Sequence, residues 1–441
     1  MIPARRPSLL YQLGLVLVTL SMLILPCLYV LLTVSAGWAV HYFAVHYFLS
    51  IWAWPMGHSR YALMVKVICS MTPLLAGGSI ALFMVKPLFA RRHARMQPLA
   101  LDPQVEPRVY ELVQRICGLL QAPAPVQINL DCEVNASARF QKGWSGFFTN
   151  KLVLTLGLPL VAGLSQRELA GVIAHEFGHF RQSAGMRMSY LIRGINGWFA
   201  RVVYERDGWD ETIDGWAVGC DSAWIGFMLG STQLAIWVSR RVLWVLMITG
   251  HLICALLLRQ MEYDADAAEI ALAGSEAFES TTLKLASLGA VLSGIHGEML
   301  RTWRRQFQLP DNLPHLVAHR VAHLPAEKRN KIENSACLEK TGFLDTHPSA
   351  ADRVRAARQM AQPGYEISDE PATELFENFD GLSRLVTLVH YEDDLNVPTS
   401  PEFLIPVQQL TAPTPALSPS APGVPMMAPE VNLPAKAEGS I

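Results

Sequence analysis

Charged residues are scarce in this chain. Asp, Glu, Lys and Arg make up 17% of its 441 residues, whereas hydrophobic residues make up 51%. An average globular domain is about a quarter charged, so this composition excludes a disordered acidic or basic tail protein. The formal net charge of −2 excludes the broad basic footprint of a nucleic-acid-binding protein, and no nucleic-acid partner is expected.

Cysteine is also sparse, because the chain has only seven and they form no CxxC pair and no even framework. Such a set indicates free thiols in a reducing compartment or in lipid, and it excludes a disulfide scaffold. No cysteine lies within a few residues of His175 or His179. Structural zinc sites usually include cysteine, so this absence counts against a purely structural zinc site.

The N-terminal part of the chain is the least charged. Residues 7–59 contain no Asp, Glu, Lys or Arg. A membrane-spanning helix needs about 20 apolar residues, and Ser8–Val34 exceeds that length. A second uncharged stretch covers Val67–Val85, and the aromatic run Trp38–Trp54 between the two is typical of a membrane–water interface. The sequence therefore predicts a two-span transmembrane hairpin over residues 1–96, with the lipid bilayer as a partner.

Cations flank this hairpin on one side of the membrane. Arg5 and Arg6 precede the first span and a basic cluster at 86–95 follows the second, whereas the intervening loop carries only Arg60. The positive-inside rule then predicts that both ends of the hairpin, and with them the soluble part of the chain, lie in the cytoplasm. The expected location is a bacterial inner membrane, in a multi-pass arrangement. A cleaved signal peptide ending near Ala36 is the competing interpretation, but its apolar stretch would be too long and the second span would still anchor the chain.

A third apolar region covers residues 216–258 and is interrupted by Arg240 and Arg241. Two further spans would place both arginines on the far side of the membrane, against the positive-inside rule. The alternative is one long helix along or partly within the membrane, since residues 242–258 extend only about 25 Å. The sequence leaves two or four spans open and predicts a membrane-associated insert at about 186–258.

The soluble part combines short strand patterns with longer helix patterns. Apolar runs predict strands at Val126–Leu130, Val134–Phe140 and Lys151–Leu156. Ser165 followed by Glu168 is a capping-box pattern that starts a helix, and we expect this helix to continue beyond His179 because no proline interrupts it. Further helices are predicted at 262–273, 275–306 and 349–361. In the C-terminal segment 366–441, the proline-rich sequence from residue 398 predicts a disordered tail.

Residues 175–179 read HEFGH, an HExxH motif, on the helix that starts at Ser165. Residues four apart share one face of a helix, so His175 and His179 can bind one zinc ion together. Glu176 lies one step round the helix, where it can take a proton from zinc-bound water without ligating the metal. The alternative is that both histidines lie on the surface of an amphipathic helix and bind no metal.

A catalytic zinc ion needs a third protein ligand, and the frequent continuation HxxGxxH is absent here. A downstream carboxylate is therefore required, and residues 261–266, MEYDAD, supply one on a predicted helix. Glu262 and Asp266 are four residues apart and share a face. Glu262 can be the third ligand, and Asp266 can accept an N–H from a zinc-bound imidazole.

Two other histidine features compete with this site. His315, His319 and His323 repeat every fourth residue and could bind a metal. However, Leu316 occupies the position that the glutamate has in HExxH, so a polar helix face is the favoured interpretation. His251 lies inside an apolar run and is interpreted as a core or interface residue rather than a ligand.

HEFGH followed after a hydrophobic insert by EYDAD resembles the HtpX and CaaX prenyl protease type of integral-membrane zinc metallopeptidases, HExxH…ExxxD gluzincins that also include the Oma-type mitochondrial proteases. Three further motifs agree with this resemblance: a strand, turn and helix at 156–179, NASA at 135–138, and THP at 346–348 with Arg353. The resemblance covers about residues 100–360 and the two-span N-terminus. It implies a mainly α fold with a small β-sheet, in which a zincin-like metallopeptidase domain at 97–365 is attached to transmembrane helices.

The resemblance also implies roles for the matching residues. One Zn²⁺ per chain would be bound by His175, His179 and Glu262, with Glu176 as the general base and Asp266 behind a ligand imidazole.

The remaining matches concern the substrate. Asn135 and Ala136 would lie on an edge strand that pairs with an extended polypeptide substrate. His347 or Arg353 would stabilise the oxyanion or shape the cleft. The alternatives, a helix-start turn for His347 and an ion pair for Arg353, carry equal weight.

The sequence thus predicts a membrane-anchored zinc-dependent endopeptidase that hydrolyses membrane or misfolded proteins, as in protein quality control. The runner-up is a catalytically silent, zinc-binding membrane scaffold or adaptor. A transporter is disfavoured by the small number of spans and by the lack of buried charge pairs in them.

Overall fold

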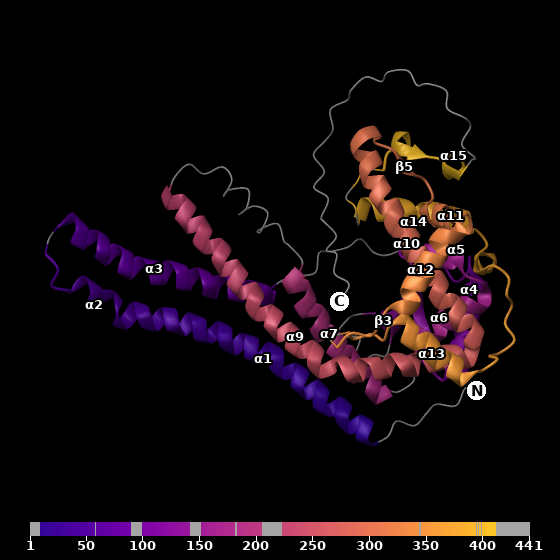
Figure 1. Ribbon diagram of the computed structural model, residues 1–441, viewed down its shortest axis with the longest axis horizontal. Helices are drawn as coiled ribbons and strands as arrows, with labels where there is room; N and C mark the ends of the chain where they lie inside the picture. The colour runs from indigo at the N-terminus through magenta and orange to yellow at the C-terminus, as the bar shows by residue number, and fades with distance from the viewer. Residues whose placement is uncertain are drawn as a thin grey trace.

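The structure is a computed structural model, and it describes residues 9–57, 59–89, 99–141, 151–180, 183–204, 223–343, 345–393, 395, 397 and 399–411. It is mostly helical with a small sheet, as the sequence predicts. Figure 1 shows an elongated arm of helices at one end and, at the other, helices gathered around the sheet. The predicted boundary between residues 96 and 97 lies outside the described residues, and the boundary at 365 stays a prediction.

The arm contains the apolar helices of the chain. Its elements are α1 (Leu9–His46), α2 (Phe48–Trp52), α3 (Arg60–Val85), η1 (Lys86–Phe89), α7 (Ser183–Tyr204) and the first part of α9 (Ala223–Ala273). α1, α3 and α9 are each long and apolar enough to cross a membrane. They meet where Tyr29 Oη donates to the Met84 carbonyl at 2.8 Å and lies 3.4 Å from Ser239 Oγ. The arm therefore joins the N-terminal hairpin to the third apolar region.

The third apolar region forms one helix where it is described. α9 continues without interruption through Arg240 and Arg241 and includes Glu262. The alternative of a further two-span hairpin is therefore wrong for residues 223–258, and residues 205–222 lie outside the described part of the chain. Arg241 packs over the ring of Trp237 at 5.3 Å, so one of the two cations is accommodated on an aromatic side chain without a break in the helix.

A four-stranded sheet stands beside the arm. Its strands are β1 (Leu99–Ala100), β2 (Pro125–Asp131), β3 (Ala136–Phe140) and β4 (Leu152–Gly157), in the order β1-β2-β4-β3. β2 and β4 are parallel, whereas β3 runs antiparallel to β4 and forms an edge. The three predicted strands are confirmed within a few residues at their ends. Asn135 precedes β3 and Ala136 is its first residue, so the NASA motif follows this edge.

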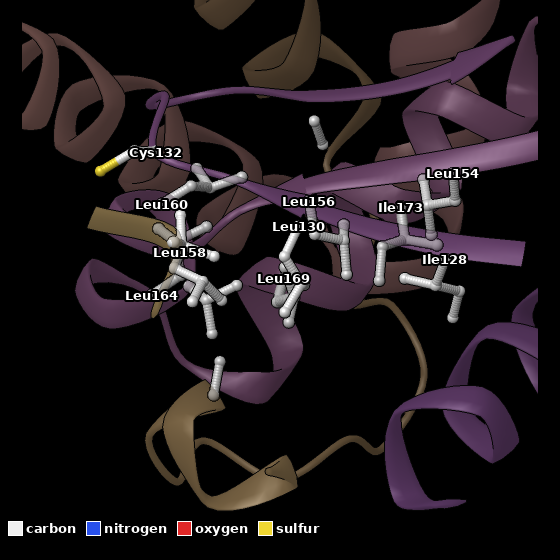
Figure 2. Packing of buried hydrophobic residues seen from close by; sticks show 14 of the residues in the cluster. Ile128, Leu130, Cys132, Leu154, Leu156, Leu158, Leu160, Leu164, Leu169 and Ile173 are labelled. Carbon is white, nitrogen blue, oxygen red and sulfur yellow. The ribbon is translucent and has the colours of Figure 1, made fainter. Parts of the chain in front are cut away.

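Helix α6 (Gln166–Gly178) carries the HExxH motif and packs on the central strands. Figure 2 shows Leu169 and Ile173 of α6 close to Ile128 of β2 and Leu156 of β4. These four side chains are fully buried. Burial of such side chains contributes roughly 1.5–3 kcal/mol each, which holds α6 at a fixed position on the sheet.

α6 also lies unusually close to α9. A Cβ placed on Gly178 would lie 3.1 Å from the Ala265 Cα and 3.1 Å from the Ala268 Cβ. One placed on Gly171 would lie 3.0 Å from the Ala273 Cβ. Glycine and alanine at this contact thus allow the HExxH helix to approach the helix that carries Glu262.

The remaining described elements pack around the sheet and α6 or against the helices that do so. They are α4 (Pro107–Leu120), α5 (Leu158–Gly163), α10 (Ser275–Gln306), β5 (Leu309–Pro310), α11 (Leu313–Ala322), α12 (Ala326–Leu338), α13 (Ala350–Met360), η3 (Ala372–Leu375), α14 (Phe379–Asp393), η4 (Pro401–Phe403), β6 (Leu404–Ile405) and α15 (Val407–Thr411). The predicted helices at 262–273, 275–306 and 349–361 are confirmed.

The predicted disordered tail is partly wrong. Residues 399–411 are ordered against the fold, because β6 pairs in parallel with β5 and Val407 is fully buried. The Val407 N–H also donates to Asp311 Oδ1 at 2.7 Å. Prolines at the start of η4 and before α15 are compatible with these short elements, since neither position needs their N–H. Residues 412–441 lie outside the described part.

Candidate metal centre and cleft

The start of α6 is fixed by the predicted capping box. Ser165 Oγ accepts from the Glu168 N–H, and Glu168 Oε2 accepts from the Ser165 N–H at 2.8 Å. Glu168 also binds Lys284 Nζ at 2.7 Å and accepts from Ser280 Oγ at 2.7 Å, both from α10. Together with the apolar packing, these contacts hold the axial rotation of α6. They therefore determine which side chains of the HExxH motif face the cleft.

His175, His179 and Glu262 converge, as the spacing predicts. His175 Nε2 lies 3.5 Å from Glu262 Oε2, and His179 Nε2 lies 3.7 Å from Glu262 Oε1. One ligand atom from each of the three lies within 4.8 Å of the others. Contrary to prediction, α6 ends at Gly178, and His179 is its C-cap with helical backbone angles, so the two imidazoles still share one face.

The donor set fits a catalytic zinc ion. A tetrahedral ion with ligand bonds of about 2.0–2.1 Å places its ligand atoms about 3.3 Å apart, close to the distances found here. Two imidazoles and one carboxylate leave a fourth position for water. His175, Asp266 and Glu269 form a second group of possible ligands, but its carboxylates lie behind His175, away from the cleft residues.

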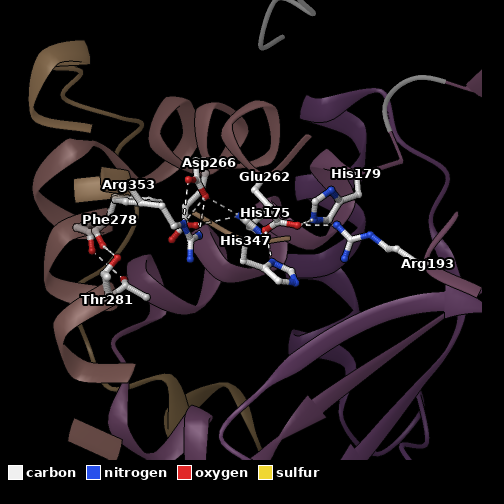
Figure 3. Close-up of polar contacts among 12 residues, drawn as sticks. His175, His179, Arg193, Glu262, Asp266, Phe278, Thr281, His347 and Arg353 are labelled. Carbon is white, nitrogen blue, oxygen red and sulfur yellow. Dashed lines mark hydrogen bonds and ion pairs between the residues drawn. The ribbon is translucent and has the colours of Figure 1, made fainter. Parts of the chain in front are cut away.

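Asp266 and Arg353 support His175 from behind. Figure 3 shows a row of polar contacts that runs from Arg353 through Asp266 and His175 to Glu262. His175 Nδ1 lies 3.1 Å from Asp266 Oδ1, while Arg353 donates through Nε and Nη2 to both oxygens of Asp266 at 2.6–3.2 Å. The Arg353 guanidinium also lies 5.4 Å from the Phe278 ring.

This placement corrects the expectation for Arg353. Its guanidinium is held by Asp266, and Arg353 is not among the residues that line the cleft. A cation in that position does not reach a developing oxyanion in the cleft. The ion-pair alternative for Arg353 is therefore the one that the contacts support.

Glu176 faces the cleft beside the metal ligands. Its Oε2 accepts a hydrogen bond from the Ala138 N–H of β3 at 3.1 Å, so the edge strand and the carboxylate are directly connected. Burial raises the pKa of Glu176 above its ordinary value. A raised pKa brings a carboxylate closer to the range in which it exchanges protons with water at neutral pH.

The two histidines have opposite protonation tendencies. Burial and the neighbouring positive charge of His175 lower the pKa of His179 to about 3, so its imidazole is neutral at pH 7. Burial alone would also lower the pKa of His175, but the carboxylates of Asp266 and Glu262 raise it to about 10. A metal ion bound between them would replace the proton of His175.

The cleft has a volume of about 390 Å³. Asn135, Ala136 and the rest of the NASA motif form one wall, and His347 lies opposite with its Nδ1 3.3 Å from Glu262 Oε2. The lining residues are Asn135, Ala136, Ser137, Ala138, His175, Glu176, His179, Phe180, Tyr190, Arg193, Met261, Glu262 and His347. The structure thus brings all predicted site residues together except Asp266 and Arg353, which stand directly behind.

Sequence reasoning missed Arg193. This residue lies on α7, and its Nη2 is 2.5 Å from Glu262 Oε1, at the end of the row of contacts in Figure 3. The signal that could have found it is an arginine in an apolar helical segment that follows the HExxH motif. The other histidine repeat does not form a comparable cluster: His319 and His323 stack with ring centroids 4.1 Å apart, and no metal-type group includes them within the described residues.

Comparison with known proteins gives a family match and one relative for this chain. Peptidase family M48 matches residues 103–361, which include both motifs and more than half of the chain. The chain belongs to peptidase family M48. This M48 chain is also 26% identical over 233 residues to the protease HtpX of Acinetobacter baylyi. That match covers 52% of this chain and 63% of the relative, so the M48 chain spans less than two thirds of the relative's length. No solved structure matches it.

Proposed function

We propose that the protein is a membrane-anchored, zinc-dependent endopeptidase. The observation that carries this proposal is the convergence of His175, His179 and Glu262 at the spacing of a three-ligand zinc site, with Glu176 beside them in one cleft. Membership of peptidase family M48 supports it.

The residues divide the work of peptide hydrolysis. When bound, the zinc ion would polarise the scissile carbonyl and lower the pKa of a water molecule towards neutrality. Glu176 would take a proton from that water and pass it to the leaving amine. His347 lies next to Glu262, and its side chain is 63% exposed. From this position its ring could donate to the developing oxyanion. Asp266 would orient His175.

The substrate would bind as an additional strand on β3. The Gly157 N–H bonds the Asn135 carbonyl and the Gln141 N–H bonds the Lys151 carbonyl, so residues 135 and 141 face β4. By strand alternation, the backbone groups of Ala136 and the carbonyl of Ala138 point to the open edge, where the Ala138 N–H donates to Glu176. An extended peptide could pair there irrespective of its sequence, which fits cleavage of diverse membrane or misfolded polypeptides.

The arm supports a membrane location for this activity. Within the described residues, three helices are long and apolar enough to span a bilayer, and α9 leads directly from the arm to Glu262. The basic residues that flank the hairpin support a multi-pass position in a bacterial inner membrane, with the cleft on the cytoplasmic side.

A catalytically silent zinc scaffold is the alternative, and Glu176 discriminates between the two. Glu176→Gln should retain about one zinc per chain and lower kcat/KM on casein or a peptide by about 100-fold or more, because the general base is lost. Glu111→Gln, at an exposed position of α4, is the matched control and should keep full activity. Cleavage by the Glu176→Gln protein at the wild-type rate would contradict the mechanism.

The ligand assignment needs its own measurement. Glu262→Ala should lose most of its zinc in a metal analysis after dialysis, since two imidazoles remain. Full zinc occupancy of this variant would move the third ligand to another residue.

A further inference from the structure

The two carboxylate oxygens of Glu262 have different neighbours. Oε1 accepts a hydrogen bond from Arg193 Nη2 at 2.5 Å, whereas Oε2 lies 3.5 Å from His175 Nε2 and 3.3 Å from His347 Nδ1. The Glu262 side chain is 5% exposed, so its neighbours rather than bulk water determine how the carboxylate is oriented. Figure 3 shows Arg193 at one end of the row of polar contacts and Arg353 at the other.

The contact with Arg193 is the shortest polar contact of this carboxylate within the described residues. It is also charge-assisted, and such hydrogen bonds are roughly twice as strong as neutral ones. Oε1 lies 3.7 Å from His179 Nε2, which is beyond hydrogen-bond distance. Arg193 therefore holds Oε1, while Oε2 is left beside the imidazole of His175.

The packing of α7 fixes the place from which Arg193 reaches Glu262. Figure 1 shows α7 beside α9 where the arm approaches the sheet. Three residues after Arg193, the side chain of Asn196 donates from Nδ2 to Cys254 Sγ of α9 at 3.1 Å. Trp198 of α7 packs edge-to-face on Tyr29 of α1, with ring centroids 6.1 Å apart. These contacts join α7 to both neighbouring helices, so the guanidinium is delivered from the arm.

The proposed chemistry requires that Glu262 use only one oxygen. Two imidazoles and one carboxylate oxygen leave the fourth position of a tetrahedral zinc site for water. A carboxylate that bound the ion through both oxygens would occupy that position. Oε2 is 3.5 Å from His175 Nε2, close to the separation of about 3.3 Å between the ligand atoms of such a site. A hydrogen bond from Arg193 to Oε1 therefore opposes binding through both oxygens.

We propose that Arg193 is a positioning residue that holds Glu262 as a one-oxygen zinc ligand, with Oε2 as the ligand atom. This inference rests on the proposed function and deepens it, because it makes a helix of the arm part of the metal site. A lysine at this position can still donate to Oε1 through its ammonium group, whereas a methionine of similar length cannot.

The test uses the full-length protein in detergent, with the metal removed by a chelator and replaced by Co²⁺. Four-coordinate cobalt absorbs visible light more strongly than five-coordinate cobalt, so the spectrum reports how many ligand atoms bind the ion. Arg193→Met should shift the wild-type, four-coordinate spectrum to the weaker, five-coordinate form, because both oxygens of Glu262 become available. Arg193→Lys should retain the wild-type spectrum.

The matched control is Arg201→Met, which removes a cation from the same helix by the same substitution. Arg201 does not line the cleft, so this variant should keep the wild-type spectrum and activity. An unchanged spectrum in Arg193→Met would overturn the proposal, and so would a five-coordinate spectrum in the wild type. Arg193→Leu replaces Arg193→Met if the latter does not fold.

Peptide kinetics of the zinc-loaded proteins distinguish positioning from contact with the substrate. Loss of an outer contact of a metal ligand typically lowers activity 10–100-fold, and we expect a fall of that size in kcat for Arg193→Met, with KM nearly unchanged. Arg193→Lys should recover most of kcat. A higher KM at wild-type kcat, with the wild-type cobalt spectrum, would instead assign Arg193 to substrate binding and overturn the positioning role.

The cobalt spectra need no substrate, so they separate this inference from the proposed function. If the spectra change as expected but the wild-type protein cleaves no peptide, the proposed function is refuted and the positioning of Glu262 by Arg193 stands. If the wild-type protein cleaves peptides and the spectrum of Arg193→Met is unchanged, only the positioning role is refuted.

Discussion

The pair between Arg353 and Asp266 yields a prediction that separates support of the metal site from catalysis. Asp266, whose side chain is 4% exposed beside Arg353, loses in Arg353→Leu the charge-assisted hydrogen bonds that Nε and Nη2 donate to its two oxygens. Removal of one partner of a buried ion pair costs about 3–5 kcal/mol. The Arg353 side chain is 25% exposed, so water replaces part of the contact and we expect about 2–4 kcal/mol.

The same change should weaken zinc binding. Asp266 lies 3.1 Å from His175 Nδ1, and Arg353 fixes the direction of its carboxylate. Loss of such an outer contact typically lowers metal affinity 10–100-fold. Competition with a chromophoric chelator measures this affinity, and thermal unfolding in detergent measures stability. At saturating zinc, kcat should fall less than tenfold, because Arg353 does not line the cleft.

An oxyanion role would give the opposite result. Loss of one oxyanion donor lowers kcat by about 100–1,000-fold. A fall of that size in Arg353→Leu, with unchanged zinc affinity, would refute the positioning role. Arg355→Leu is the matched control, since Arg355 is exposed on the same helix and pairs with Asp352. In the double variant Asp266→Asn with Arg353→Leu, the loss of stability should be smaller than the sum of the single losses.

Three further predictions follow from the positions of α6 and β3. Gly178→Ala should weaken zinc binding and lower stability by about 1–2 kcal/mol, because the new Cβ would lie 3.1 Å from the Ala265 Cα on α9; wild-type affinity in a chelator titration would contradict this. Burial alone would raise the pKa of Glu168, but its contacts with Lys284 and Ser165 hold it below the ordinary value. Glu168→Gln should thus lower the free energy of unfolding by about 1–3 kcal/mol at pH 7. Denaturant titrations should show this difference disappear as the pH falls through the lowered pKa of Glu168, whereas a difference that grows in acid would be inconsistent. Ala136→Pro removes an N–H from the open edge of β3 and should lower kcat/KM at unchanged zinc content, and equal peptide kinetics would exclude strand pairing there.

The parts of the site that could be predicted are those encoded by local spacing. The four-residue separation of His175 and His179 and the capping box at Ser165 depend only on helix geometry. The strands are also predictable from local sequence, because their apolar runs are short and bounded by turn residues. Glu262 has no local signal of its own, and it was found only as the complement of the HExxH motif.

The parts that could not be predicted depend on tertiary contacts. Arg193 is 69 positions from Glu262, and only the packing of α7 beside α9 brings them together. Whether Arg353 faces the cleft or supports Asp266 from behind depends on tertiary packing. The spacing of residues in the sequence does not reveal it. The order of residues 399–411 depends on pairing with β5 and on the pocket that buries Val407, so a proline-rich composition alone was misleading.

Under the proposed function, the continuity of α9 determines where along its length a bound polypeptide would be cut. Leu258, at the end of the apolar region, and Glu262 are separated by four residues of one unbroken helix, a rise of about 6 Å. The unbroken helix therefore fixes the distance between the cleft and the apolar segment of α9. A polypeptide that leaves the bilayer beside α9 would meet the cutting point within its first few residues, whereas a distant loop of the same protein would have to fold back to be cut.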